Sequence, residues 1–311
     1  MLHAGTSPIS RAPQAPRQTK VSLSDTIRLL LLSAIWGASF LFMRIAVPEL
    51  GPFPTTFARI GGAALVLLPF LLRPEHRHVL RDCKTRLLVL GLFSSALPFS
   101  LLCWATLYLE AGFTSLLNAT TPICAALIGF WWLRIPLTRF QSLGLVIGLA
   151  GIAILTGDQL DFRRDGAGWP ILAVIGATAC YGFAGHYTRI RLAHLSPLAV
   201  SAGSLLAATL ILLPLVLLFP PPALPGPGAL ASALALALLC TAVAFILFFG
   251  LLKRNGATAA TTVTFIIPAF GILWGALFLQ EEVTARMILG MAVALLGTAF
   301  VTRLIPRPTS P

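Results

Sequence analysis

Ten long apolar segments decide what this chain can fold into. Each runs for about 18 to 25 residues, the length that an α-helix needs to cross a hydrocarbon core of about 30 Å. Their apolar residues are continuous and do not alternate, which favours helices over the strands of a closed barrel. We therefore predict an all-α integral membrane protein with ten transmembrane helices at residues 27–47, 55–72, 87–109, 113–133, 140–157, 168–188, 197–219, 228–252, 257–279 and 285–303.

The composition agrees with a chain that lies almost wholly in the bilayer. Hydrophobic residues make up 57% of the 311 residues and charged residues 10%, whereas a globular domain carries about a quarter charged residues. Residues 1–26 are rich in Ser, Pro, Gln and Arg, and they predict a disordered basic cytoplasmic tail without the apolar region of a signal peptide. Residues 304–311 predict a second, short cytoplasmic tail.

The formal net charge of +12 is distributed as in a membrane protein. With the N-terminus placed inside, 17 of the 22 lysines and arginines fall in cytoplasmic segments. The positive-inside rule therefore places both termini in the cytoplasm, and we expect a multi-pass protein of the inner cell membrane with the lipid bilayer around it. No nucleic-acid partner is expected, because no basic surface domain remains to bind one.

The sequence offers no metal or cofactor site. The five cysteines stand singly at Cys83, Cys103, Cys124, Cys180 and Cys240, as small packing residues do. The segment "HRHVLRDC" at 76–83 has metal-compatible residue types without a ligand spacing, so we interpret it as a solvated basic loop. We expect no cofactor and no bound metal.

The sequence repeats itself after about half its length. Because five spans is an odd number, a second copy would run through the membrane upside down relative to the first. We predict two inverted five-helix repeats at residues 27–157 and 168–303, an arrangement that places a substrate site near the membrane midplane and permits alternating access. A shift of 146 positions aligns Pro122/Pro268, Gly129/Gly275, Thr138/Thr284, Gly144/Gly290 and Gly151/Gly297, and a shift of 145 aligns Gly37/Gly182, Arg44/Arg189, Pro52/Pro197 and Pro69/Pro214, with Trp36 over Tyr181.

Four motifs in this order resemble the EamA branch of the drug/metabolite transporter superfamily. They are "IWGASFLFMR" in the first span, "FARIGGAALVLLP" in the second, "AGFTSLLNATTP" in the fourth and "QEEVTARMILGMAVALLG" entering the tenth. The resemblance covers roughly residues 27–303 and implies a central cavity enclosed by spans one to four and six to nine, with spans five and ten packed behind. The family's acidic "GERLT" turn is "RIPLT" in the first copy, while the second copy keeps Glu281 and Glu282.

Two prolines interrupt spans four and nine. Pro122 and Pro268 each remove an intrahelical donor and free a carbonyl four residues earlier. In lipid this is tolerated where polar side chains or water satisfy the carbonyl, and Asn118, Thr121 and Thr264 lie in that neighbourhood. We predict helix kinks whose polar stripes face a hydrated path; static kinks packed against neighbouring helices are the alternative.

Other polar and aromatic residues of the spans are candidates for the same path. Arg59 lies roughly 9 Å inside the second span and needs a partner, either an anionic substrate or one of Glu49 and Glu110. His186 suits proton coupling or a hydrogen-bonded packing role, while Arg44 and Arg189 are expected to reach the interface. The residues predicted to bind substrate are Trp36, Ser39, Phe40, Arg59, Asn118, Thr121, Tyr181, His186, Thr264 and Phe265.

Small residues form stripes on spans five and ten. These are Gly144, Gly148 and Gly151 on one span and Gly290, Ala294 and Gly297 on the other. Such stripes let helices approach closely, and a homodimer contact is one use for them.

These features together predict a secondary transporter that exports small metabolites or drugs, with a small amphipathic or zwitterionic metabolite as its partner. No carboxylate lies near the membrane centre, so coupling through His186, Glu110 or Glu49 and passive exchange stay open. A membrane-embedded enzyme acting on lipids is the first alternative, although the sequence has no HExxH motif, nucleophile elbow or carboxylate pair. A sensor or scaffold that transports nothing is the second, and we expect the chain not to be an enzyme.

Overall fold

A computed structural model describes residues 22–163 and 166–302, and every regular element within them is helical. Most of the two predicted tails lies outside these residues, but α1 already begins at Leu23, so the first tail is shorter than predicted. The elements are α1 (Leu23–Leu50), α2 (Pro52–Leu71), α3 (Arg77–Asp82), α4 (Lys84–Gly91), η1 (Leu92–Ala96), α5 (Leu97–Ala105), α6 (Ala111–Asn118), α7 (Thr121–Leu133), α8 (Arg139–Thr156), η2 (Gly157–Gln159), α9 (Gly168–Arg191), α10 (Pro197–Leu218), α11 (Pro227–Ala237), η3 (Leu238–Val243), α12 (Ala244–Leu279) and α13 (Ala285–Val301).

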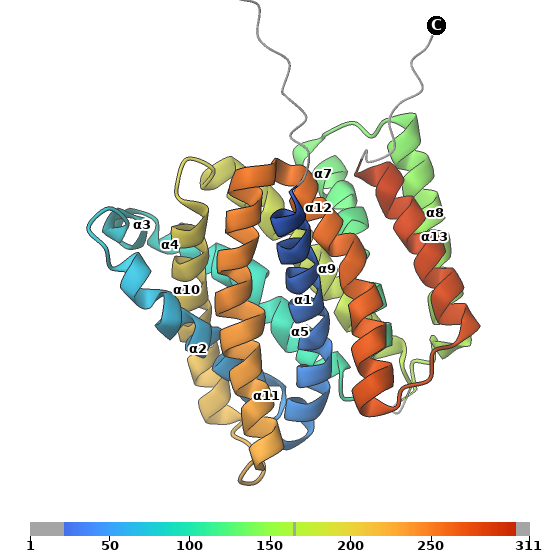
Figure 1. Ribbon diagram of the computed structural model, residues 1–311, viewed down its shortest axis with the longest axis horizontal. Coiled ribbons are helices and arrows are strands. Elements are labelled where there is room, and N and C mark those ends of the chain that lie inside the picture. The colour runs from blue at the N-terminus through green and yellow to red at the C-terminus, as the bar shows by residue number, and fades with distance from the viewer. Residues whose placement is uncertain (1–21, 164–165, 303–311) are drawn as a thin grey trace, which may run out of the picture.

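Ten apolar helical segments build a single bundle, shown in Figure 1. In the described part of the chain, nine of them are at least 18 residues long and apolar enough to cross a membrane, and α13 is a shorter apolar helix. Several segments contain more than one element, because η1 and η3 are single π-helical stretches inside spans three and eight. The prediction of an all-α membrane protein with ten helices is therefore confirmed.

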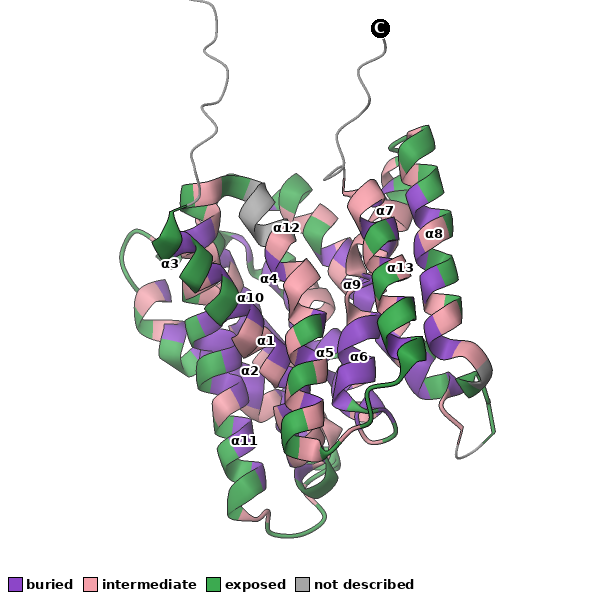
Figure 2. Cartoon of the chain, turned by 45° about the vertical axis from the view of Figure 1, so that its right-hand side comes forward, coloured by how far each residue is buried: buried purple, intermediate pink, exposed green. Residues whose placement is uncertain are grey.

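The outside of the bundle is apolar, as a lipid environment requires. Figure 2 shows buried residues on the inward faces of the helices and exposed residues on the outward faces. Large apolar side chains are among the exposed ones, including Leu65 at 70%, Trp131 at 79% and Leu217 at 75%. An exposed surface of this kind would favour aggregation in water and is matched by acyl chains.

Local backbone features recur 146 residues apart. The π-helices begin at Leu92 and Leu238. The helices of spans four and nine both end at a non-glycine residue in the left-handed region, Arg134 with φ 53° and Gln280 with φ 58°. Four residues after these helix ends, Thr138 and Thr284 are the N-caps of the next helices. The side chain of Thr138 accepts a hydrogen bond from the backbone nitrogen of Gln141, and that of Thr284 accepts one from the backbone nitrogen of Met287.

The small-residue stripes on α8 and α13 pack against each other. The two helices lie side by side at one edge of the bundle (Figure 1). A Cβ added to Gly144 would lie 2.7 Å from the carbonyl oxygen of Gly297, and one added to Gly290 would lie 2.9 Å from the Cβ of Leu155. The two stripes are therefore used within the chain, and a homodimer stays a prediction.

Two further glycines bring helices together inside the bundle. A Cβ on Gly37 in α1 would lie 3.0 Å from the backbone nitrogen of Gly271 in α12. A Cβ on Gly182 in α9 would lie 2.9 Å from the backbone nitrogen of Ala125 in α7. Both glycines therefore allow their helices to approach closely.

Replacing Gly297 by leucine tests the α8–α13 contact. A Cβ at this position would lie 2.6 Å from the carbonyl oxygen of Gly144, so the side chain meets backbone that cannot yield. We expect Gly297→Leu to lower the free energy of unfolding by about 1–3 kcal/mol, measured as a lower melting temperature of the detergent-purified protein. Gly185→Leu is the matched control, because nothing lies within 4 Å of a Cβ there. Equal melting temperatures for the two variants would contradict the packing described.

Candidate functional site

Arg59 is a buried cation within the bundle. It lies about 10 Å from the start of α2, at 1.5 Å per residue, and is only 4% exposed. Its Nε donates to Oγ1 of Thr241 at 3.1 Å, and its Nη2 donates to Oγ of Ser39 at 3.4 Å. Its Nη1 lies 3.8 Å from the sulfur of Met43, and its Cζ lies 3.9 Å from the ring centroid of Phe99. Spans one, three and eight therefore all contribute to its surroundings.

No carboxylate neutralises Arg59. None of the ion pairs within the described residues includes it. Glu49 instead accepts a 2.6 Å hydrogen bond from the backbone nitrogen of Gly226, and Glu110 lies within electrostatic range of Arg44, Glu281 and Glu282. The predicted alternative of a structural bridge from Arg59 to Glu49 or Glu110 is wrong.

The π-helices help to position the groups around Arg59. Thr241 lies in η3, where its hydroxyl donates to the carbonyl of Leu236 at 2.8 Å and accepts from Arg59. Phe99 lies in α5, shortly after η1. Sequence reasoning did not identify Thr241 or Phe99 as parts of the site, whereas Met43 lies on the polar and aromatic stripe of the first span that it considered for the cavity. The one available signal was the hydroxyl residue Thr241 in an apolar span, aligned with Ser95 after the shift of 146.

The predicted aromatic residues do not form one wall. Tyr181 lies beside the Arg59 site, with its ring edge-on to Phe99 at 6.1 Å between centroids. Trp36 instead packs on Phe248 at 5.3 Å in a separate apolar cluster. Phe40 is buried in the main core, and Phe265 is half-buried on α12. The structure therefore brings Ser39, Arg59 and Tyr181 together, keeps Phe40 in the same buried cluster as Met43 and Phe99, and places Trp36 in another cluster.

Span four is broken into two helices before Pro122. Helix α6 ends at Asn118 and α7 begins at Thr121, whose hydroxyl donates to the carbonyl of Asn118 at 2.7 Å. This is the carbonyl that Pro122 was predicted to free, and a polar side chain satisfies it as expected. The side-chain Oδ1 of Asn118 is buried and has no hydrogen-bond partner among the side chains and backbone that the structure describes. In span nine, α12 continues through Pro268, with half-buried Thr264 one turn earlier, and its non-helical residue is Gly256.

His186 links span six to span four. Its Nε2 lies 2.8 Å from the carbonyl oxygen of Ala125, one turn beyond Pro122, and therefore donates the hydrogen bond. A Cβ on Gly129 would lie 3.0 Å from the same nitrogen, so the imidazole packs closely on α7. Of the two interpretations of His186, the contacts match a hydrogen-bonded packing histidine.

Glu281 fastens the turn before α13 to the start of α6. Its two carboxylate oxygens accept hydrogen bonds from the backbone nitrogens of Ala111 at 2.7 Å and Gly112 at 3.0 Å. A carboxylate is favourable there because a helix N-terminus carries unsatisfied donors and a partial positive charge. The aligned residue of the first copy is Ile135, which lacks a carboxylate, so this contact has no counterpart there.

Arg44 holds the end of span three. Its Nη1 donates to the carbonyls of Thr106 at 2.6 Å and Leu107 at 3.1 Å. Arg44 therefore satisfies free carbonyls at the C-terminal end of a span, as a guanidinium near a helix C-terminus can, and its position at the membrane interface stays a prediction. Arg189, at the end of α9, is exposed.

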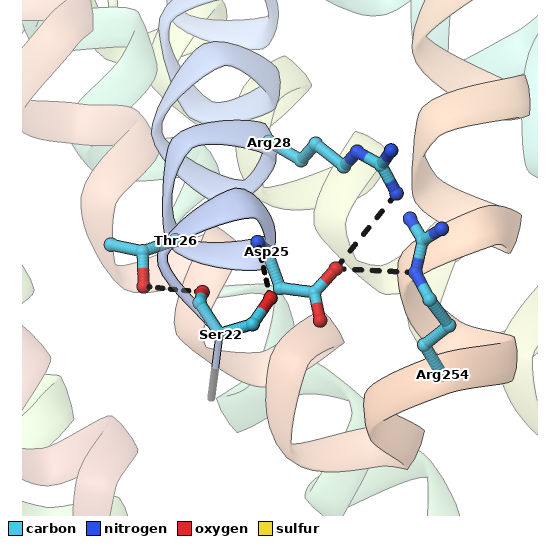
Figure 3. Close-up of polar contacts among 5 residues, drawn as sticks. All are labelled: Ser22, Asp25, Thr26, Arg28 and Arg254. Atoms are coloured by element: carbon cyan, nitrogen blue, oxygen red, sulfur yellow. Dashed lines mark hydrogen bonds and ion pairs between the residues drawn. The ribbon is translucent and has the colours of Figure 1, made fainter. Parts of the chain in front are cut away.

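An ion pair joins α1 to α12 at the opposite end of the bundle from Glu281. Figure 3 shows Asp25 pointing toward Arg254 and Arg28, with oxygen-to-nitrogen distances of 3.1 and 3.9 Å. The Oγ of Ser22 accepts from the backbone nitrogen of Asp25 at 3.2 Å and caps the start of α1. Arg254 precedes by two residues Gly256, where φ is 68° and the helix of span eight meets that of span nine.

Two cavities open beside Tyr108 rather than beside Arg59. One, of about 590 Å³, is lined mainly by Trp104, Tyr108 and Trp169. The other, of about 360 Å³, is lined by Glu110, Glu282 and Arg286 among others. Partial burial raises the pKa of Glu110, and the charges of Glu281 and Glu282 raise it further, while Arg44 lowers it.

Comparison with known proteins gives a consistent result. The model of the EamA-like transporter family matches residues 26–157 and again residues 168–303. An "Uncharacterized transporter YoaV" of Bacillus subtilis is 24% identical over 86% of this chain and 93% of its own length. A "Probable terminal-alkyne amino-acid exporter" of Streptantibioticus cattleyicolor is 24% identical over 91% of this chain and 95% of its own. A solved crystal structure shares the fold, with a TM-score of 0.64 at 19% identity over 92% of this chain and 99% of its own.

Replacing Glu281 by glutamine tests its contact with α6. The change keeps the shape but removes the charge that the two N–H groups bind, so we expect a loss of about 1–2 kcal/mol in the free energy of unfolding and faster hydrogen exchange at Ala111 and Gly112. The exposed neighbour Glu282→Gln is the control and should leave exchange at both amides unchanged. Unaltered exchange in Glu281→Gln would show that the carboxylate does not hold this helix.

Glu110→Gln tests the charge crowding at this end. Because the pKa of Glu110 is raised in the folded protein, the folded state binds its proton more readily than the unfolded state, and the ionised carboxylate is destabilising at neutral pH. We expect Glu110→Gln to melt at a higher temperature than the wild type at pH 7. The difference should shrink as the pH falls through the raised pKa and vanish below the ordinary one. A variant that melts lower at pH 7 would contradict the raised pKa.

Proposed function

The chain belongs to the EamA-like transporter family, and from this premise we propose that it is a secondary carrier that moves a small metabolite across the membrane by alternating access. It is a multi-pass membrane protein. The two relatives named above match it over nearly their whole length, and one is named as a transporter and the other as an exporter. We propose no catalytic role, since those names and this family describe transport.

We propose further that the two matched regions are inverted repeats. The recurrence of π-helices, left-handed helix ends and threonine caps 146 residues apart supports a duplication. So does the packing of Gly37 on α12 and of Gly182 on α7, because these contacts join equivalent residues of the two halves. With five spans in each half, the halves run in opposite directions through the bilayer.

The observation that carries the proposal is Arg59. Its contacts come from spans one and three of the first half and from span eight of the second, so a charged group lies buried where the halves meet. A charge at this depth is costly to hold in a membrane, and carriers place such groups where a solute binds. The partnerless Oδ1 of Asn118, beside the break in span four, supports a second polar contact for the solute. Trp36, Phe40, Thr121, His186, Thr264 and Phe265 complete the proposed path.

Contacts at the two ends of the bundle suggest how access would alternate. The Asp25–Arg254 ion pair joins α1 to α12 at one end, and Glu281 joins the turn before α13 to α6 at the other. Opening one end would break the polar contacts of that end and leave those of the other end in place. The non-helical backbone at Gly256, next to the ion pair, supplies a place for α12 to bend.

Export through the inner cell membrane is the direction we propose. The bias of lysine and arginine toward one side supports cytoplasmic termini, and the relative from Streptantibioticus cattleyicolor is named as an exporter. That relative is named for an amino acid, a small solute with polar and apolar parts, and we propose a solute of similar size here.

Counterflow in proteoliposomes tests the carrier proposal. Purified protein, reconstituted with unlabelled solute inside, should accumulate the same radiolabelled solute saturably for at least one member of a broad panel of amino acids, organic acids, amines and sugars. We expect Asn118→Leu to slow this exchange at least about tenfold, because it removes a hydrogen bond made in the bound state. Ser142→Ala, on the exposed face of α8, should leave the rate unchanged.

Failure of every solute in the panel to exchange would contradict the carrier proposal. Turnover of a lipid by the same purified protein would point to the membrane-enzyme alternative instead. Exchange that Asn118→Leu leaves untouched would keep the carrier and remove Asn118 from its path.

A further inference from the structure

We propose that Arg59 binds a single carboxylate group of the transported solute, which makes the substrate a monocarboxylate with an apolar or aromatic body. The inference rests on the proposed carrier function and adds the chemical class of its substrate. It starts from an imbalance: the guanidinium is only 4% exposed, and the side chains that contact it within the described residues, Ser39, Met43, Phe99 and Thr241, are all uncharged.

The partners that Arg59 does have are weak for a buried cation. A guanidinium carries five N–H donors. Here they meet one hydroxyl at 3.1 Å, a second at the long distance of 3.4 Å and a thioether sulfur at 3.8 Å, together with the face of Phe99. Burial of a charge is costly unless an opposite charge and good hydrogen bonds compensate for it. A carboxylate would supply both, through two parallel charge-assisted hydrogen bonds.

The single positive charge of Arg59 favours a solute with a single negative charge. Arg44 in α1 is already bound to the carbonyls of Thr106 and Leu107. The residue of the second half that aligns with Arg59 after the shift of 145 is Ser204, which is buried and uncharged. One cation balances one anion, whereas a phosphate ester with two charges would leave an unpaired negative charge in the membrane.

The side chains around Arg59 favour a solute whose remaining part is apolar or aromatic. Met43 and Phe99 contact the guanidinium directly, and Tyr181 lies edge-on to Phe99. An apolar chain or ring bound next to the carboxylate would pack against these side chains. Arg59 belongs to the first half and Thr241 to the second, so a carboxylate that replaced their contact would also loosen a connection between the halves.

A purely structural role for Arg59 makes a different prediction. If the guanidinium serves as a clamp between Phe99 and Thr241, its removal must destabilise the protein without solute. If the guanidinium instead serves to bind the solute, its replacement by a neutral side chain of similar length removes a buried charge that the empty protein does not compensate. Arg59→Met should then melt at the same temperature as the wild type or higher, since binding residues are often kept at a cost in stability.

Thermal melting of the detergent-purified full chain with matched probes tests the inference. The probes are isovalerate, phenylacetate, L-leucine and L-phenylalanine at neutral pH, each beside its primary amide, which keeps the body and removes the negative charge. We expect at least one acid to raise the melting temperature while its amide does not. Arg59→Gln should weaken binding of that acid by about tenfold or more, because a charge-assisted pair is lost. Arg59→Lys should retain part of the binding, and Arg189→Gln, at the exposed end of α9, should retain all of it.

Three results would overturn the inference: no acid-specific shift in the panel, an acid-specific shift that survives in Arg59→Gln, or an Arg59→Met protein that melts well below the wild type. Counterflow separates this failure from failure of the carrier proposal. Exchange of neutral solutes or amines that is unaffected by Arg59→Gln would keep the carrier and reject the carboxylate site. Arg59-dependent binding of an acid that is never exchanged would keep the site and reject the carrier.

Discussion

A membrane interior offers no water to complete hydrogen bonds or solvate charges, and this constraint governs the whole structure. It makes every span helical and leaves leucine and tryptophan on the outer surface. It also makes each interruption conspicuous. Where Pro122 frees the carbonyl of Asn118, the Thr121 hydroxyl satisfies it, and where span three ends, Arg44 satisfies two carbonyls. Against this background of satisfied groups, the uncompensated charge of Arg59 stands out.

Helix packing and polar contacts have different roles within the bundle. Glycines let α8 meet α13, and they let α1 and α9 meet the broken or bent spans. Such contacts are extensive and non-directional, and they hold the bundle together in any state that keeps the helices paired. The ends are held differently, by the few directional contacts of Glu281 and of Asp25 with Arg254. In a carrier, the glycine-mediated packing would preserve the fold while the polar contacts at the ends break and reform.

The sequence was sufficient for the spans and for much of the local chemistry, but not for the partners. The lengths of the apolar segments predicted the ends of the ten spans to within a few residues, because the thickness of the bilayer sets how long a spanning helix must be. Helical spacing identified the stripes of Gly144 and Gly290 but not that they face each other, because spacing defines a face and not its neighbour. For the same reason Arg59 was a clear candidate while Thr241, 182 residues away, was not. The backbone partners of Arg44 and Glu49 were not predicted, because local pairing rules cannot see which carbonyls or amides a fold leaves free.

The central claim is that the Arg59 site is reachable from both sides of the membrane in turn, although it is closed in the state described. Ser39→Cys, introduced after replacement of the five native cysteines, places a thiol beside the guanidinium. Membrane-impermeant thiol reagents applied from one face and then the other measure access directly. The account predicts labelling of this thiol from both faces; labelling from one face alone, or from neither, would contradict it.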